Sequence, residues 1–136
     1  MKLFEPRGGQ TGERREQHLP DRVPVDAYGN GGFRFGGMSH RGSILCLPSG
    51  VHGWPVVDAA GITVDSLRPV FAEAAGFDTL LIGTGNTLVP PGPDVVAALR
   101  MAGIRFEPMS TGAALRIFNI MQGENRKVAA AFLAVD

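Results

Sequence analysis

Two apolar stretches in the second half of the chain decide the fold. Residues 79–85 read Thr-Leu-Leu-Ile-Gly-Thr-Gly, and residues 128–135 read Val-Ala-Ala-Ala-Phe-Leu-Ala-Val. The second stretch is apolar at every position, so both of its faces must be covered, which predicts a strand inside a sheet. The first predicts a buried strand that ends where the chain turns at Gly83-Thr84-Gly85.

Three helices and one more strand are expected around these stretches. Each helix begins at a capping residue or a proline and stops at a glycine. Their expected limits are Asp65 or Ser66 to Gly76, Pro91-Gly92-Pro93 to Gly103, and Ser110 or Thr111 to Gly123. In the third helix the expected apolar side holds Ala114, Ile117, Phe118 and Met121. Residues 104–109 predict a strand between the second and third helices.

Upstream, three short strands are expected at residues 33–35, 43–47 and 51–57, separated by short turns. Short turns between successive strands favour an antiparallel meander. Pro55 within the third predicts an edge or interrupted strand. A meander followed by alternating helices and strands predicts an α/β domain with a mixed sheet.

The first 26 residues differ from the rest. They mix basic and acidic side chains with Gly8-Gly9 and prolines 6, 20 and 24, so no helical or strand period survives. We expect a flexible N-terminal arm at 1–26 and a single α/β domain at 27–136. The arm either docks on a partner or is a solvated tail, and the second reading is favoured.

Composition excludes several classes of function. Thirteen basic and thirteen acidic residues cancel, so no net charge draws the whole protein to nucleic acid or an anionic membrane. Cys46 is the single cysteine, so no internal disulfide can form, and the histidines do not stand at metal-ligand spacing. No signal peptide and no apolar run long enough for a membrane helix is recognised, so we expect a cytoplasmic protein.

The first candidate site is the loop Gly83-Thr84-Gly85-Asn86, which follows a strand and precedes a helix. Phosphate-binding loops of doubly wound sheets occupy this place. The dinucleotide fingerprint, however, needs a glycine where Leu88 stands, and the chain has no GKS or GKT sequence. A sharp turn off a buried strand is the favoured reading.

The second candidate is Ser110-Thr111-Gly112 together with Asn119. If the strands ending at Ile82 and Met109 are parallel neighbours, this loop and the first candidate open into one crevice. Free amides at the start of the third helix could then bind an anion. Alternatively, Ser110 or Thr111 only caps the helix, and Asn119 reaches a backbone group or faces solvent.

A hydrolytic site and a basic patch are weaker candidates. His40 has a serine neighbour in Ser39, and His52 lies nearby, but no GxSxG sequence or orienting acid stands at a recognisable spacing. Solvated ion pairs or an interface explain the remaining basic residues better than nucleic acid does. These residues are Arg41, Arg116, Arg126 and Lys127.

Several stretches together resemble a known family. They occur in the order Gly42-Ser43-Ile44-Leu45-Cys46-Leu47-Pro48, Trp54, Leu81-Ile82-Gly83-Thr84-Gly85, Gly103-Ile104, Met109-Ser110-Thr111-Gly112-Ala113-Ala114, Asn119 and residues 124–131. The resemblance is to the small α/β domains that include the mitochondrial respiratory complex I assembly factor 3 and uncharacterised bacterial and archaeal relatives. It covers roughly residues 30–135.

The resemblance implies a three-layer α/β fold with a mixed sheet and no established catalytic residue or cofactor. It also implies protein partners, because eukaryotic members help to assemble the membrane-bound NADH:ubiquinone oxidoreductase. Ile117-Phe118-Asn119 stands where the family often has Thr-Tyr-Asn. The loss of two hydroxyls weakens any proton-transfer role for the third helix.

Two functions are therefore expected. The first is a non-catalytic interaction protein that assists biogenesis of a membrane complex, acting as a monomer or weak homo-oligomer. The alternative is a small-molecule or anion-binding module, or an enzyme that uses the same crevice. Its crevice would be formed by Gly83, Thr84, Gly85, Asn86, Ser110, Thr111, Gly112 and Asn119.

Overall fold

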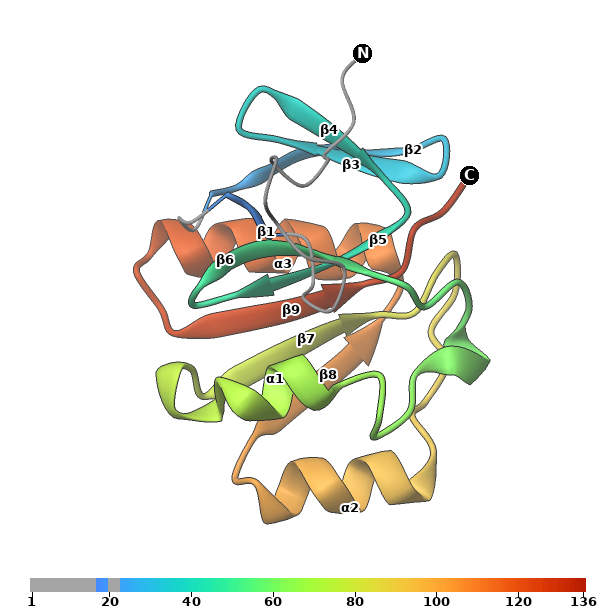
Figure 1. Cartoon of the computed structure of the whole chain (residues 1–136), viewed down its shortest axis with the longest axis vertical. Coiled ribbons are helices and arrows are strands. Elements are labelled where there is room, and N and C mark those ends of the chain that lie inside the picture. Colours follow the sequence, from blue (N-terminus) through green and yellow to red (C-terminus); the bar gives the residue numbers. More distant parts are fainter. Residues whose placement is uncertain (1–16, 20–22) are drawn as a thin grey trace, which may run out of the picture.

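The computed structural model describes residues 17–19 and 23–136 (Figure 1). The strands are β1 Gln17–Leu19, β2 Val25–Gly29, β3 Gly32–Phe35, β4 Met38–Arg41, β5 Ser43–Leu47, β6 Gly50–Trp54, β7 Thr79–Gly83, β8 Arg105–Met109 and β9 Val128–Phe132. The helices are α1 Arg68–Ala72, α2 Pro93–Met101 and α3 Thr111–Gly123, with short 3₁₀ turns η1 Ala59–Gly61 and η2 Ala74–Gly76.

A six-stranded mixed sheet, in the order β1-β6-β5-β9-β7-β8, forms the middle layer. Strand β9 is antiparallel to β5 and parallel to β7, and β8 is parallel to β7. All five residues of β9 are buried. The predicted interior position of residues 128–132 is confirmed, and the chain leaves the sheet after Phe132.

Helices α1 and α2 cover one face of this sheet. Helix α3 and a second, three-stranded sheet cover the other face (Figure 1). The second sheet has the order β2-β3-β4 and is antiparallel. Its Phe33 ring lies 5.9 Å from that of Phe132, and Phe118 of α3 meets Phe132 edge-on at 5.6 Å. The expected three-layer α/β fold with a mixed sheet is confirmed, and the first strands of the chain are shared between two sheets.

Strands β1, β2 and β4 lie in segments where the sequence predicted none. Gln17–Leu19 pair with β6, and Val25 and Asp26 begin β2, so strands occur within the expected arm; residues 1–16 and 20–22 lie outside the described residues. Val25 is buried beside α3. Strand β1 pairs with the distant β6, whereas β2 and β4 flank β3 in short hairpins. Only one residue is buried in each of β2 and β4, so their local pattern is weak.

The strand expected over residues 51–57 ends at Trp54, since Pro55 cannot donate to a ladder. It lies next to the edge, because β1 pairs with its outer side. In α3 the buried residues include Leu115, whereas Ile117 is exposed. The buried side of α3 is therefore rotated by part of a turn from the side that the sequence predicted.

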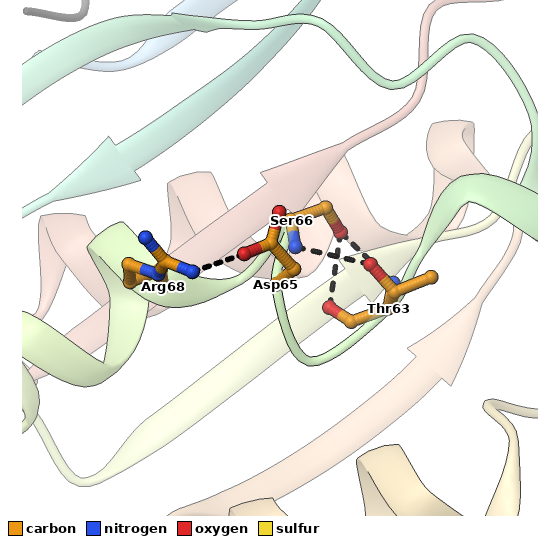
Figure 2. Close-up of polar contacts among 4 residues, drawn as sticks. All are labelled: Thr63, Asp65, Ser66 and Arg68. Carbon is orange, nitrogen blue, oxygen red and sulfur yellow. Dashed lines mark hydrogen bonds and ion pairs between the residues drawn. The ribbon is translucent and has the colours of Figure 1, made fainter.

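The cap expected at Asp65 or Ser66 is wrong: α1 begins after Leu67, whose side chain makes no cap hydrogen bond, and the preceding turn is closed by Thr63 and Ser66 (Figure 2). The Thr63 hydroxyl accepts from Ser66 N at 3.0 Å, and the Ser66 hydroxyl accepts from Thr63 N at 2.9 Å. This reciprocal pair resembles a capping box, in which two backbone donors at a helix start are satisfied together. Asp65 instead forms an exposed ion pair with Arg68.

Strand β8 is an edge strand of the large sheet, and its sequence discourages further pairing. Arg105 N donates to Asp78 O, and Met109 O accepts from Thr84 N, so the odd-numbered residues face β7. The backbone polar groups of Phe106 and Pro108 therefore point away from β7, toward the open edge of the sheet. Proline has no N–H to offer a neighbouring strand, which protects this edge from strand addition.

We expect Ala130→Asp to destabilise the fold by about 3–5 kcal/mol, because it places an unpaired carboxylate in a fully buried strand. Urea denaturation measures the change. Ala97→Asp on the exposed side of α2 is the matched control and should cost less than about 1 kcal/mol. Equal midpoints for the two variants would show that residue 130 does not lie in the interior.

Candidate functional site

The two predicted loops meet at the carboxyl ends of β7 and β8, where two threonines fasten them together. Thr84 N donates to Met109 O at 2.8 Å, and the Thr84 hydroxyl contacts Met109 O and Thr87 O. Thr111 N donates to Gly85 O at 2.8 Å, and its hydroxyl accepts from Gly85 N at 3.0 Å. The strands β7 and β8 are parallel neighbours, as the sequence argument required, but hydrogen bonds close the space between the two loops that follow them.

The Thr111 hydroxyl also donates to Leu133 O at 2.8 Å and thereby joins three strand ends. A side chain at Gly83 would not fit here, because its Cβ would stand 2.9 Å from Thr111 Cα and 3.2 Å from the Phe132 ring. Thr111 is fully buried and Thr84 is 5% exposed. These groups therefore serve the fold, and their hydrogen-bonding capacity is used within the protein.

At the start of α3, Ser110 is the cap residue: its hydroxyl accepts from Ala113 N at 3.3 Å. The neighbouring Gly112 is covered, since the Tyr28 hydroxyl lies where a Cβ would project. A ligand at this helix start would have to displace Tyr28. Of the two capping residues that the sequence allowed, the structure uses Ser110.

Asn119 lies two turns further along α3 and binds backbone. Its side-chain oxygen accepts from Val25 N at 3.0 Å, and its amide nitrogen donates to Val25 O at 2.8 Å. The side chain thus pairs with β2 much as a neighbouring strand would. Among the alternatives left by the sequence, Asn119 reaches a backbone group and holds the small sheet on α3.

An open cleft of about 960 Å³ lies beside the closed crevice. Of the predicted site residues, Thr84, Gly85 and Asn86 line it, whereas Gly83, Ser110, Thr111, Gly112 and Asn119 do not. Its other walls come from the β4–β5 junction, the segment after β6 and the tail after β9. The sequence therefore located one wall of the cleft and missed the others, which belong to segments without a recognisable motif.

The cleft combines apolar walls with a few polar groups. Val56, Leu133 and Val135 contribute apolar surface, and Arg41, Asp58 and Asn86 contribute charge or an amide. The Trp54 indole N–H donates to Ser66 O at 2.8 Å and is therefore committed to the fold. His40 and Ser43 also line the cleft, and the Ser43 hydroxyl accepts from Ala134 N at 2.9 Å. Such a lining suits the binding of a molecule that is partly apolar.

A polar cluster that the sequence did not indicate joins the β5–β6 turn to the end of α1. Ser49 N and Oγ donate to the two carboxylate oxygens of Glu73 at 2.9 and 2.6 Å, and Ser49 Oγ lies 2.7 Å from His52 Nε2. Since the serine proton goes to Glu73, His52 must donate to the serine oxygen. This order differs from that of a hydrolytic triad, where histidine accepts the proton of serine.

Burial shifts the pKa values of two further side chains that could take part in chemistry, Cys46 and His40. Burial raises the pKa of the Cys46 thiol far above its usual range, so it stays protonated and unreactive. Burial also lowers the pKa of His40, although a hydrogen bond with the Ser43 backbone opposes this. Among residues 17–19 and 23–136, no group of three or more His, Cys, Asp and Glu side chains could hold a metal ion.

Comparison with protein families shows what this architecture is similar to. Residues 25–133, most of the chain, match the model of a family described as protein of unknown function (DUF498/DUF598). The chain belongs to this family.

Named relatives lie in bacteria and animals. An uncharacterized protein of Rhodobacter capsulatus is 34% identical over 119 residues, which cover 88% of this chain and 90% of that protein. The mouse NADH dehydrogenase (ubiquinone) 1 alpha subcomplex assembly factor 3 is 30% identical over 118 residues, covering 87% of this chain. The match spans 64% of the mouse protein. The expected resemblance to the assembly-factor family is confirmed.

A solved structure supports the fold directly. The crystal structure of an outer membrane protein from Bartonella henselae is 45% identical and superposes with a TM-score of 0.85, covering 88% of this chain and 100% of that one. In the described part of the present chain, no helix combines the length and apolar character needed to cross a bilayer. Two proteins that match most of this chain are thus described differently, one as an assembly factor and one as an outer membrane protein.

We expect Thr111→Val to destabilise the protein by about 2–4 kcal/mol, because the partly buried Gly85 N and the buried Leu133 O both lose their partner. Chemical denaturation measures the loss. Thr87→Val, at an exposed position in the loop between β7 and α2, is the control and should change stability little. If both variants unfold at the same denaturant concentration, the threonine does not hold the loops together.

His40 predicts a dependence of stability on pH. Its pKa is lower in the folded protein than in the unfolded chain, so acidification below about pH 6.5 favours the unfolded state. Stability from this group is present above that pH and is lost as the pH falls. We therefore expect the melting temperature of His40→Gln to fall less than that of wild type between about pH 7.5 and 5.5. Parallel curves would contradict this assignment.

Proposed function

We propose that this protein is a non-catalytic interaction factor that assists biogenesis of a membrane complex of the NADH:ubiquinone oxidoreductase type. The observation that carries the proposal is the 30% identity to the mouse assembly factor over 87% of this chain. The match extends over both sheets and all three helices, so the shared unit is the whole domain rather than one motif. We place its action in the cytoplasm, on partner proteins, as a monomer or weak homo-oligomer.

The geometry of the site supports a role without bond-making. In the crevice where the fold would place a ligand, both threonine hydroxyls are bonded to backbone atoms. The thiol is buried and protonated, and the serine–histidine contact has the wrong order for acyl transfer. A rigid domain with a cleft at one end is suited to holding a partner segment.

Genetic replacement tests this function. In Rhodobacter capsulatus, deletion of the gene for the 34% identical relative should lower NADH-dependent quinone reduction in membranes, and expression of this chain should restore it. Succinate-dependent quinone reduction in the same membranes is the internal control and should not change. Native gels should show loss of the assembled complex rather than loss of activity in an intact one.

Two results would count against the proposal. One is an unchanged amount of assembled complex in the deletion strain. The other combines two observations. A folded variant with a single substitution in the cleft fails to rescue the deletion strain although wild type rescues it, and the purified wild-type protein turns over a metabolite. The second outcome would favour an enzyme.

The alternative function is a small-molecule or anion-binding module, and the cleft of about 960 Å³ favours it, since ligand sites of globular proteins have this size. A melting-temperature screen with a metabolite panel tests it. Asn86→Leu should abolish a shift that involves the cleft, whereas Thr87→Val, which lies outside the lining, should keep it. Gly85 is unsuitable for this test, because its φ of +103° makes any larger residue strained.

A further inference from the structure

The outward face of the small sheet holds polar groups that the fold does not use. Phe33 and Phe35 of β3 point into the core, so Arg34 between them points away from it. In the β3–β4 ladder Arg34 stands opposite Ser39, and Gly32 stands opposite Arg41. Because alternate residues share a face, Gly32, Arg34, Ser39 and Arg41 all lie on this outward face.

A shallow hollow of about 280 Å³ lies on this face. Arg34, Ser39 and Arg41 line it together with Gly29, Asn30 and Gly32, and no carboxylate does. Gly32 must be glycine, because a Cβ there would collide with the His40 carbonyl oxygen. The space between the two arginines is therefore left empty by a requirement of the backbone.

The two arginines can converge on one small anion. They are diagonal neighbours on adjacent antiparallel strands, about 7 Å apart at the backbone, and a guanidinium is carried on a side chain long enough to span that gap. Neither makes an ion pair or hydrogen bond within the described part of the chain. Asp26 of β2, an acid on the same small sheet, is not paired with either of them.

Ser39 gives an independent indication. It is only 7% exposed, and within residues 17–19 and 23–136 its hydroxyl makes no hydrogen bond. The Ser39 oxygen is not among the fully enclosed polar atoms, so it is open to the hollow between the two arginines and can donate to an acceptor brought by a ligand.

We propose that this hollow binds a phosphate-type oxyanion, held by the guanidinium groups of Arg34 and Arg41 and by the hydroxyl of Ser39. Arginine forks match the paired oxygens of phosphate, and the small volume fits one phosphate group better than a whole nucleotide. The site differs from the cleft beside Asn86, although Arg41 lines both. It does not rest on the assembly function.

Amide and arginine-side-chain NMR spectra of the full chain, titrated with inorganic phosphate at constant ionic strength, test the proposal. The expected shifts are at Gly32, Ser39 and the Nε–H groups of Arg34 and Arg41. Arg34→Gln and Arg41→Gln should each weaken binding by about tenfold or more, and Ser39→Ala by about threefold to tenfold. Arg105→Gln, which changes an exposed arginine on β8, is the matched control and should bind as wild type does.

Several outcomes separate the possible ligands. Shifts confined to this face that saturate with phosphate but not with malonate support the phosphate class. Tighter binding of malonate or of an oligoglutamate peptide would overturn it in favour of carboxylates. Shifts spread over all arginines, or equal affinity in the double Arg34→Gln/Arg41→Gln variant, would show only non-specific attraction. If Arg41→Gln fails to fold, Arg34→Gln and the wild-type shift map still decide.

If phosphate binds, titration with a phosphorylated metabolite such as glycerol 3-phosphate and with a phosphoserine peptide identifies the source of the group. Stronger binding of the metabolite than of phosphate supports a small-molecule ligand. Stronger binding of the peptide supports a phosphorylated partner, while loss of binding for both supports free phosphate. Each result leaves the recognised chemistry the same.

Discussion

The position of β9 is the constraint on which the rest of the structure depends. This strand pairs antiparallel with β5 and parallel with β7, so it alone joins the meander half of the large sheet to the βαβ half. Its residues 129–131 are alanines, and small side chains on both faces let a helix layer approach from each side. Phe132 at its end then supplies the bulk against which Phe33 and Phe118 pack. Phe132 therefore contributes to placing both the small sheet and α3, together with the Asn119–Val25 hydrogen bonds.

The segment after β9 also helps to determine where the open cleft lies, which is not the carboxyl-end crevice between β7 and β8 that the topology favours. Ligands of parallel sheets usually bind where neighbouring loops diverge at the carboxyl ends of strands. Here the divergence lies between β7 and β8, and Thr84 and Thr111 close it by bonding to backbone on the opposite loop. Leu133, just beyond β9, accepts the third bond of this arrangement. The open space is consequently displaced toward the tail after β9 and the segment after β6.

The sequence predicts those elements whose stability is local or whose burial is complete. Strand β9 is apolar throughout, and β5 and β7 are apolar after their first residue. Ser110 and Gly103 mark helix ends by conformational preferences of single residues. Strands β2 and β4 escaped detection because each buries only one residue, and β2 is held in addition by a partner far away in the chain. Asn119 illustrates the latter: it binds the backbone of Val25, which lies 94 residues away. The Ser49–His52–Glu73 cluster also joins separate segments, and no spacing rule connects them.

Unused polar capacity identifies where a partner or ligand can act, because a folded chain normally satisfies the polar groups it buries. In the described residues, Thr84, Thr111, Ser49, Asn119 and Trp54 of the large sheet and its crossovers all bond internally, whereas the buried side-chain oxygen of Gln122 on α3 has no hydrogen-bond partner. The small sheet differs, since Arg34, Ser39 and Arg41 stand around a glycine floor and bond to nothing within it. Because Arg41 also borders the cleft, an anion held on the outer face would alter the charge at the cleft rim. The two sites are thus electrostatically connected through one side chain, whichever partner the cleft accepts.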